Sequence, residues 1–169
     1  NLFDGVSVRE DSGIDICKNV FGYESAFQMP DPTLLLSKNE YMTLCDEQEM
    51  TGHSLLVYFL DNNEDKINLV NIVAKEKKTE PYWINMGNIT LPSIGHWLSS
   101  FRDAEYVVTD SFHACVFSII FHKPFIVYGN SERGLSRFTS LLKTFHLEER
   151  MILNTQEFNS EKLKHLPDD

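Results

Sequence analysis

Short runs of consecutive apolar residues alternate with longer segments from residue 53 onward. Four of these runs have the length of a β-strand: SLLVYFL, YWIN, YVVTD and PFIVYGN. Strands that are apolar at successive positions are typical of a parallel sheet covered on both faces. Their alternation with helices favours right-handed crossovers. We therefore predict an α/β fold with a Rossmann-like, open, mainly parallel sheet flanked by helices.

The segments between these strands carry apolar residues at helical spacing. In the helix KINLVNIVAKEKK, Ile67, Val70, Ile72 and Val73 are expected on or near one buried face. A helix in SIGHWLSSFRDA is expected to begin at a Ser93 cap. The last helix, GLSRFTSLLKTFHL, is expected to turn five apolar residues inward: Leu135, Phe138, Leu141, Leu142 and Phe145.

The first fifty residues predict smaller elements. VSVRE has the pattern of a strand, and a helix is expected to begin at a Ser12 cap and to end at Gly22. A short strand broken by Pro30 and Pro32 follows, and then a short helix capped by Ser37.

These elements hold too little apolar surface to form a domain alone. The polar stretch DEQEMTG separates them from the regular alternation, so we divide the chain into residues 1–50 and a domain at 51–169. The opening lacks a methionine and begins almost at once with a strand. We therefore expect the chain to be the back portion of something longer.

The charge is strongly acidic but unevenly distributed. Fifteen basic and twenty-five acidic residues give a net charge of −10, which argues against non-specific nucleic-acid binding. Segment 111–147 carries four bases and one acid, a net +3, so the remainder carries −13. A small anionic ligand is therefore expected at this segment.

Several other classes of protein and site are disfavoured. No stretch approaches the roughly 18 apolar residues of a membrane span, and the start lacks a signal-peptide pattern, so we expect a cytoplasmic protein that does not span a membrane. The three cysteines are far apart in the sequence: Cys17, Cys45 and Cys115. We therefore expect free thiols in a reducing compartment rather than disulfides or a zinc site. No acidic or histidine cluster has metal-ligand spacing, so metal-independent chemistry is expected.

The stretch VVTDSFHACVFS places polar residues between two apolar segments. Asp110 and Ser111 follow a predicted strand, and His113 falls in the first turn of the next helix. Ligands of open α/β sheets gather at the carboxyl ends of the strands, where a helix N-terminus also attracts anions. His113 is therefore expected to face the ligand, while Asp110 or Ser111 caps the helix.

A second polar loop, GNSERGLSRF, follows the next strand. Arg133 and Arg137 can supply forked donors that match a carboxylate or a phosphate. Both loops belong to the same edge of the predicted sheet, so they are expected to converge on one anion.

The chain also resembles a known family. The long block AEYVVTDSFHACVFSIIFHKPFIVYGNSERGLSRFTSLLKTFHLEER, together with VSVREDSG, DPTLLL and SIGHWLSSFRDA, is similar to the polysaccharide pyruvyl transferase family. The resemblance covers nearly the whole chain apart from about the last fifteen residues. It implies a GT-B-like fold of two Rossmann-like halves. Residues 51–169 would then be the C-terminal, donor-binding half and 1–50 the end of an N-terminal half that is otherwise missing.

The resemblance further implies a bacterial enzyme of exopolysaccharide biosynthesis. Such an enzyme transfers the enolpyruvyl group of phosphoenolpyruvate to two hydroxyls of a sugar or lipid-linked oligosaccharide, giving a pyruvate ketal and phosphate without a further cofactor. The chain as given is expected to be an incomplete, inactive fragment. Ala114 stands where the family pattern usually has glycine, and its methyl group is expected to crowd a phosphate slightly.

Within that resemblance, His113 and Arg9 are the predicted catalytic residues. His113 would act as an acid or base or hold the phosphate, and Arg9 would clamp an anion unless it pairs with Glu10 or Asp11. The predicted donor-binding residues are Ser111, which could equally be only a helix cap, Arg133, and Arg137, which could instead pair with Glu132.

Two alternative functions stay open. A GT-B-like glycosyltransferase that uses a nucleotide-sugar would need a carboxylate on the ribose, a place that only Glu132 fills by position. A non-catalytic binding or assembly module is favoured by the missing front half and by Ala114.

Overall fold

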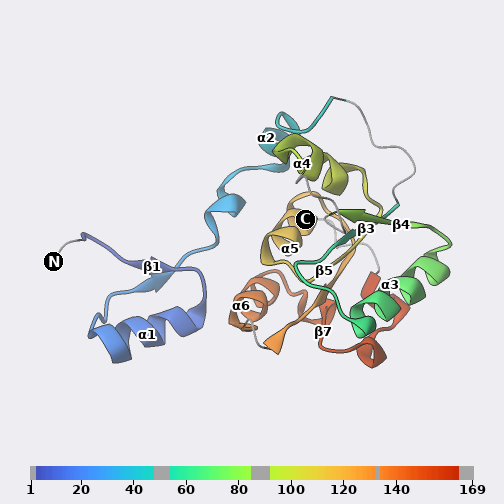
Figure 1. The fold of residues 1–169 in the computed structure, drawn as a ribbon. Helices are drawn as coiled ribbons and strands as arrows, with labels where there is room; N and C mark the ends of the chain where they lie inside the picture. The colour runs from blue at the N-terminus through green and yellow to red at the C-terminus, as the bar shows by residue number, and fades with distance from the viewer. Residues whose placement is uncertain (1–2, 48–53, 85–91, 132–133, 164–169) are drawn as a thin grey trace.

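The computed structural model describes residues 3–47, 54–84, 92–131 and 134–163. Its main part, the sheet body (residues 54–163), is built on a five-stranded parallel sheet in the order β4-β3-β5-β6-β7 (Figure 1). The strands are β3 (Leu55–Tyr58), β4 (Pro81–Ile84), β5 (Tyr106–Thr109), β6 (Phe125–Tyr128) and β7 (Met151–Ile152). The predicted open α/β sheet is confirmed, and the short β7 adds an edge strand that the sequence pattern did not predict.

Successive strand residues enter opposite layers, because side chains alternate across a sheet. Leu56 and Val107 lie in the larger apolar cluster, whereas Leu55 and Val108 lie in the smaller one. The larger cluster contains residues of α4 (Ile94–Asp103), α5 (Phe112–Ile120) and α6 (Ser136–Thr144). The smaller cluster contains residues of α3 (Glu64–Lys77) and of the C-terminal segment, where three short 3₁₀ helices lie: η3 (Glu148–Arg150), η4 (Thr155–Glu157) and η5 (Ser160–Leu163).

The strand order determines where a ligand is expected. α3 leaves β3 on one face of the sheet, and α5 leaves the neighbouring β5 on the other face. Parallel sheets bind ligands at the carboxyl ends of the strands where the chain direction reverses in this way. The edge at Tyr58 and Asp110 is therefore the topological switch point of the sheet.

Two predicted helix faces need correction. In α3 the buried residues are Lys66, Leu69, Val70 and Val73, while Ile67 and Ile72 are more than a third exposed. Lys66 takes an inner position because it pairs with Asp110, a buried acid directly after β5, and no apolar pattern reveals this pair. In α6, Phe145 follows the last helical residue and is 37% exposed rather than buried.

Local signals placed most helix ends correctly. Ser93 and Ser37 cap their helices as predicted, and Ser37 forms a capping box with Glu40. Gly22 ends α1 with a φ of 65°, the left-handed conformation that favours glycine. The predicted Ser12 cap is wrong, because α1 already begins at Asp11 and the Asp11 carboxylate accepts a hydrogen bond from the Ser12 N–H.

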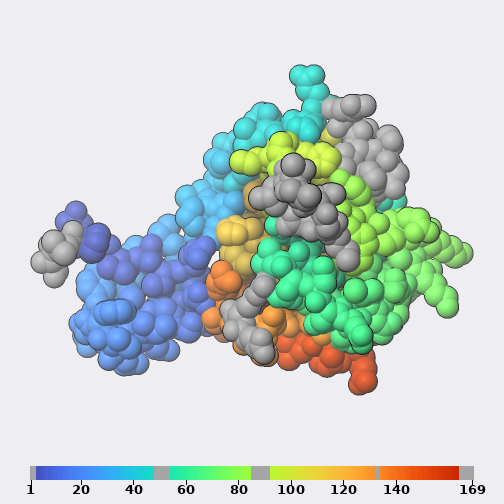
Figure 2. Space-filling model, viewed as in Figure 1, coloured from blue at the N-terminus to red at the C-terminus, as the bar shows by residue number. Residues whose placement is uncertain are grey.

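Residues 7–28 form a separate small layer, the N-terminal unit. It consists of β1 (Ser7–Val8) and β2 (Phe27–Gln28), which pair in parallel, and of α1 (Asp11–Phe21) between them. This unit projects from the side of the sheet body and touches it near α6 (Figures 1 and 2). No residue of α1 is buried, although Ile16, Val20 and Phe21 are apolar.

A connecting segment returns the chain to the sheet body through η1 (Pro32–Leu35) and α2 (Lys38–Met42). Tyr41 of α2 is buried in the larger cluster, and its hydroxyl donates to the Thr33 carbonyl at 2.8 Å. Residues 48–53, where the predicted division of the chain falls, lie outside the described residues, so the domain limits stay a prediction. No described helix combines the length and apolar character of a membrane span.

Candidate functional site

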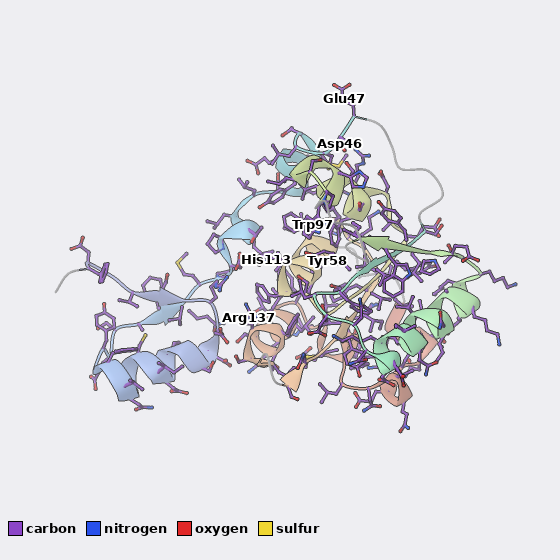
Figure 3. The ribbon with its side chains drawn as sticks, viewed as in Figure 1. Asp46, Glu47, Tyr58, Trp97, His113 and Arg137 are labelled. Carbon is purple, nitrogen blue, oxygen red and sulfur yellow. The ribbon has the colours of Figure 1, made fainter. Side chains whose placement is uncertain are left out.

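His113 is the second residue of α5, and 54% of its side chain is exposed. Figure 3 shows His113 and Arg137 on the side of the sheet body that faces the N-terminal unit. Asp31 lies close to the His113 ring, with its Oδ2 4.0 Å from Nε2. When the ring is protonated, the two groups form an ion pair.

Arg9 reaches the same carboxylate from the N-terminal unit. Its Nη1 donates to Asp31 Oδ2 at 2.5 Å, and 44% of its side chain is exposed. The partners that the sequence suggested, Glu10 and Asp11, instead accept hydrogen bonds from Ser136 and Ser140 of α6. Two sets of contacts therefore position Arg9. Asp31 binds its guanidinium group, and the hydrogen bonds of the next two residues to α6 hold its backbone.

Arg137 joins this group through an aromatic ring. The guanidinium carbon of Arg137 lies 5.4 Å from the centre of the Phe112 ring, and that of Arg9 lies 5.9 Å from it. Phe112 also contacts the His113 ring edge to face, with 5.5 Å between the ring centres. Three of the predicted site residues, far apart in the sequence, thus surround one buried phenylalanine.

Asp31 is the site residue that sequence reasoning missed. It caps η1 by accepting hydrogen bonds from the Thr33 N–H and hydroxyl, and its side chain is only 4% exposed. Burial alone raises the pKa of the Asp31 carboxyl. The hydrogen bonds from Thr33 and Arg9 and the charge of Arg9 outweigh burial, so the pKa is lowered below its usual value. Its position in the block DPTLLL was the one available signal.

This lowered pKa predicts an acid-dependent contribution of Asp31 to stability. A carboxyl whose folded-state pKa is depressed stabilises the fold above its ordinary pKa, about 3.9, and loses that contribution as the pH falls through the folded value. We expect Asp31→Asn to lower the free energy of unfolding at pH 7 and to make little difference near pH 2. Urea denaturation of both proteins across this range checks the prediction. A difference that grows toward low pH contradicts it.

A comparison with known protein families identifies the family of the chain that carries these residues. The model of the family described as polysaccharide pyruvyl transferase matches residues 1–132 of the chain. The chain belongs to the polysaccharide pyruvyl transferase family. The matched part includes Arg9, Asp31, Ser111 and His113, and it ends before Arg137. No curated protein and no solved structure gave a significant match to the chain.

In this pyruvyl transferase family member, Ser111 and Ala114 lie inward. The Ser111 hydroxyl accepts a hydrogen bond from the Ala114 N–H at 3.5 Å, so Ser111 caps α5, and the residue is 6% exposed. The predicted contact of Ser111 with the donor stays a prediction. Ala114 is fully buried in the larger cluster, so its methyl group packs in the core of this pyruvyl transferase. Arg133 and Glu132 lie outside the described residues.

The other side of the switch point is occupied by a buried ion pair. Asp110 accepts hydrogen bonds from the Leu60 N–H at 2.7 Å and from Lys66 Nζ at 2.6 Å, and both charged side chains are 1% exposed. Lys66 also donates to the Asp61 carboxylate. Asp110 therefore stabilises the β3–α3 loop. Of the two residues predicted as possible caps of α5, it is Ser111 and not Asp110 that caps the helix.

The β3–α3 loop also differs from the glycine-rich loop that binds a nucleotide in Rossmann folds. In a Rossmann fold the first such loop is rich in glycine and cradles a pyrophosphate at the helix N-terminus. Here the loop between β3 and α3 reads FLDNN, without glycine, and Glu64 and Asp65 follow it in the first turn of α3. These acidic residues repel an anion on this face, whereas Arg9 and Arg137 lie against Phe112 on the opposite one. Among the described residues no group of acidic, histidine or cysteine side chains is arranged to hold a metal ion.

Proposed function

We propose that the chain carries the donor site of a pyruvyl transferase that uses phosphoenolpyruvate to form a pyruvate ketal on a cytoplasmic precursor of a bacterial surface polysaccharide. The observation that supports the proposal most is the convergence of Arg9, His113 and Arg137 around Phe112 in a member of this family. Phosphoenolpyruvate is a compact anion that carries a carboxylate and a phosphate. Two guanidinium groups and an imidazole match its charge and its size.

The proposed roles follow from the chemistry of each side chain. Arg9 and Arg137 bind the carboxylate and the phosphate, and Asp31 keeps the Arg9 guanidinium in place. His113, exposed and next to Asp31, exchanges protons with the substrates. Ser111 and Arg133 are proposed as further donor contacts from the same two loops.

The proposed reaction balances without a metal or a redox cofactor. One sugar hydroxyl forms a bond to C2 of the enolpyruvyl group while C3 gains a proton, so the methylene becomes a methyl group. A second hydroxyl of the same sugar then attacks C2, and the bond from C2 to the phosphate oxygen breaks. Two hydroxyl protons are released in all. One replaces the proton delivered to C3, and the other leaves with the phosphate.

We further propose that the N-terminal unit is the end of a larger N-terminal half of a GT-B-like enzyme. Its parallel strand pair is only two residues long on each side, and α1 exposes Val20 and Phe21 by 69% and 74%. A two-stranded unit with an uncovered apolar helix is marginal by itself. Strands and helices of the same half would cover it.

The donor proposal is tested by isothermal titration of the 169-residue chain with phosphate and with phosphoenolpyruvate. We expect a Kd of about 1 mM, or about −4 kcal/mol, because only part of the cleft is present. Binding should weaken as salt rises, because the attraction is between charges at a partly open site. No transfer of pyruvate to a sugar and no release of phosphate are expected from this chain alone.

Two results would contradict this proposal. Turnover by the chain alone would show that no further N-terminal half is needed. Absence of any anion binding, or binding of uridine diphosphate alone in saturation-transfer NMR, would remove the donor site and favour the glycosyltransferase alternative. Arg137→Ala tests the proposed contact directly, since it should weaken the binding of both phosphate and phosphoenolpyruvate.

A further inference from the structure

A second hollow lies beside the proposed donor site. It measures about 230 Å³, and it is bordered by Arg9 and Asp31 and by the Phe112 ring, but by neither His113 nor Arg137. The hollow and the donor site therefore share the Arg9–Asp31 pair and the phenylalanine as a common wall. The rest of its lining comes from the β2–η1 segment and from α6.

The walls of this pocket are mainly apolar and partly aromatic. Leu34, Phe112, Leu141 and Phe145 line it, with Phe112 and Leu141 almost fully buried and Phe145 37% exposed. Ligand pockets commonly combine such walls with a few polar groups that orient the ligand. Such aromatic and apolar side chains suit the C–H faces of a sugar ring.

The polar groups of the pocket call for a ligand rich in hydroxyls. The Gln28 amide N–H₂ donates to the Arg9 carbonyl at 3.4 Å, which leaves its oxygen as an acceptor. The Thr144 hydroxyl donates to the Ser140 carbonyl at 2.9 Å, so it too is left to accept. Asp31 accepts, and the Arg9 guanidinium has N–H groups beyond the one given to Asp31. Acceptors and donors are thus both present, as a polyol requires.

The charge of the pocket distinguishes its ligand from the donor. Arg9 and Asp31 neutralise each other at its border, and the remaining lining residues are uncharged. The excess positive charge lies on Arg137 and, when protonated, His113, outside this pocket. A neutral ligand is therefore favoured inside it and an anion next to it.

We propose that this pocket binds one neutral sugar ring, the acceptor of the transfer. The inference rests on the proposed function, because it assigns the second substrate of the same site. A hydroxyl that contacts Asp31 Oδ2 from the pocket lies next to His113, whose Nε2 is 4.0 Å from that oxygen. The volume is below the roughly 300–1,000 Å³ of pockets for drug-sized ligands, so a single ring is accommodated rather than a nucleotide.

The test uses two threonine substitutions on the same helix. Thr144→Phe adds a ring to the lining of the pocket, whereas Thr139→Phe adds the same ring to an exposed position of α6 outside that lining. Saturation-transfer NMR is recorded on each protein with methyl glucoside, methyl galactoside and methyl mannoside. Phosphate titration and thermal unfolding are measured on the same samples.

We expect at least one of these glycosides to bind the unmodified chain and the Thr139→Phe variant. In Thr144→Phe its affinity should fall at least about fivefold, because the added ring fills the pocket. Thr144→Ala, which removes the acceptor hydroxyl without adding volume, should weaken the sugar about twofold to tenfold. Phosphate affinity should stay unchanged in all three variants, and unfolding midpoints should confirm that they fold.

Sugar affinity that is equal in Thr144→Phe and Thr139→Phe overturns the inference, as does the failure of all three glycosides to bind the unmodified chain. These results differ from a failure of the donor proposal, in which phosphate and phosphoenolpyruvate do not bind the unmodified chain at all. Competition between phosphoenolpyruvate and the sugar is a further measurement. If they compete in the unmodified chain, and compete equally or more strongly in Thr144→Phe, the pocket belongs to the donor and the inference is overturned.

Discussion

Lys66→Met is expected to lower the free energy of unfolding by about 3–5 kcal/mol, the usual effect of removing one partner of a buried ion pair. Methionine has a similar length and fits between the rings of Phe59 and Tyr128, which Lys66 Nζ approaches at 5.4 and 5.5 Å. The loss therefore does not come from a cavity. It comes from the Asp110 carboxylate, which is left 1% exposed without its counter-charge.

Urea denaturation measures this effect, and Lys75→Met on the exposed side of the same helix is the matched control. The control should stay within about 0.5 kcal/mol of the unmodified chain, as surface substitutions usually do. The double variant Lys66→Met with Asp110→Asn should recover part of the loss, because the unpaired charge is then removed as well. A Lys66→Met chain as stable as its control would show that the pair contributes nothing.

If the chain acts as proposed, His113→Ala is expected to lower the turnover of the full-length enzyme at least about a hundredfold, the lower range for loss of a proton-transferring group. The effect should appear in the rate and not in the fold, because the His113 side chain is more than half exposed. Phosphate release from phosphoenolpyruvate in the presence of an acceptor measures the rate.

His146→Asn is a suitable control for this substitution. His146 is exposed after α6 with a φ of 55°, a conformation that asparagine tolerates well, and it lies outside the site. Its turnover should equal that of the unmodified enzyme. A rate for His113→Ala close to that of His146→Asn would exclude His113 from proton transfer and leave it only a place beside the anion.

Part of the site was predictable because it depends on local signals and on topology. A strand, a polar end and a helix cap follow one another in the sequence around Ser111, so the start of α5 could be placed without coordinates. Parallel strands bring their carboxyl ends to one edge. His113 and Arg137 could therefore be assigned to a common region from the strand-helix alternation alone. The family resemblance extended this group to Arg9.

The sequence by itself thus determined four strands of the sheet, most helix caps and the common region of His113 and Arg137. Only the tertiary structure decided the acidic partners. Asp31 joins Arg9 and His113 because the connecting segment folds back onto α5. Lys66 turns inward because Asp110, directly after the distant strand β5, pairs with it. Both choices depend on charges brought together over 22 and 44 residues of chain. Local propensity and apolar periodicity cannot predict such pairs. They depend on the polarity of each side chain, and not on the distant partner that compensates for its burial.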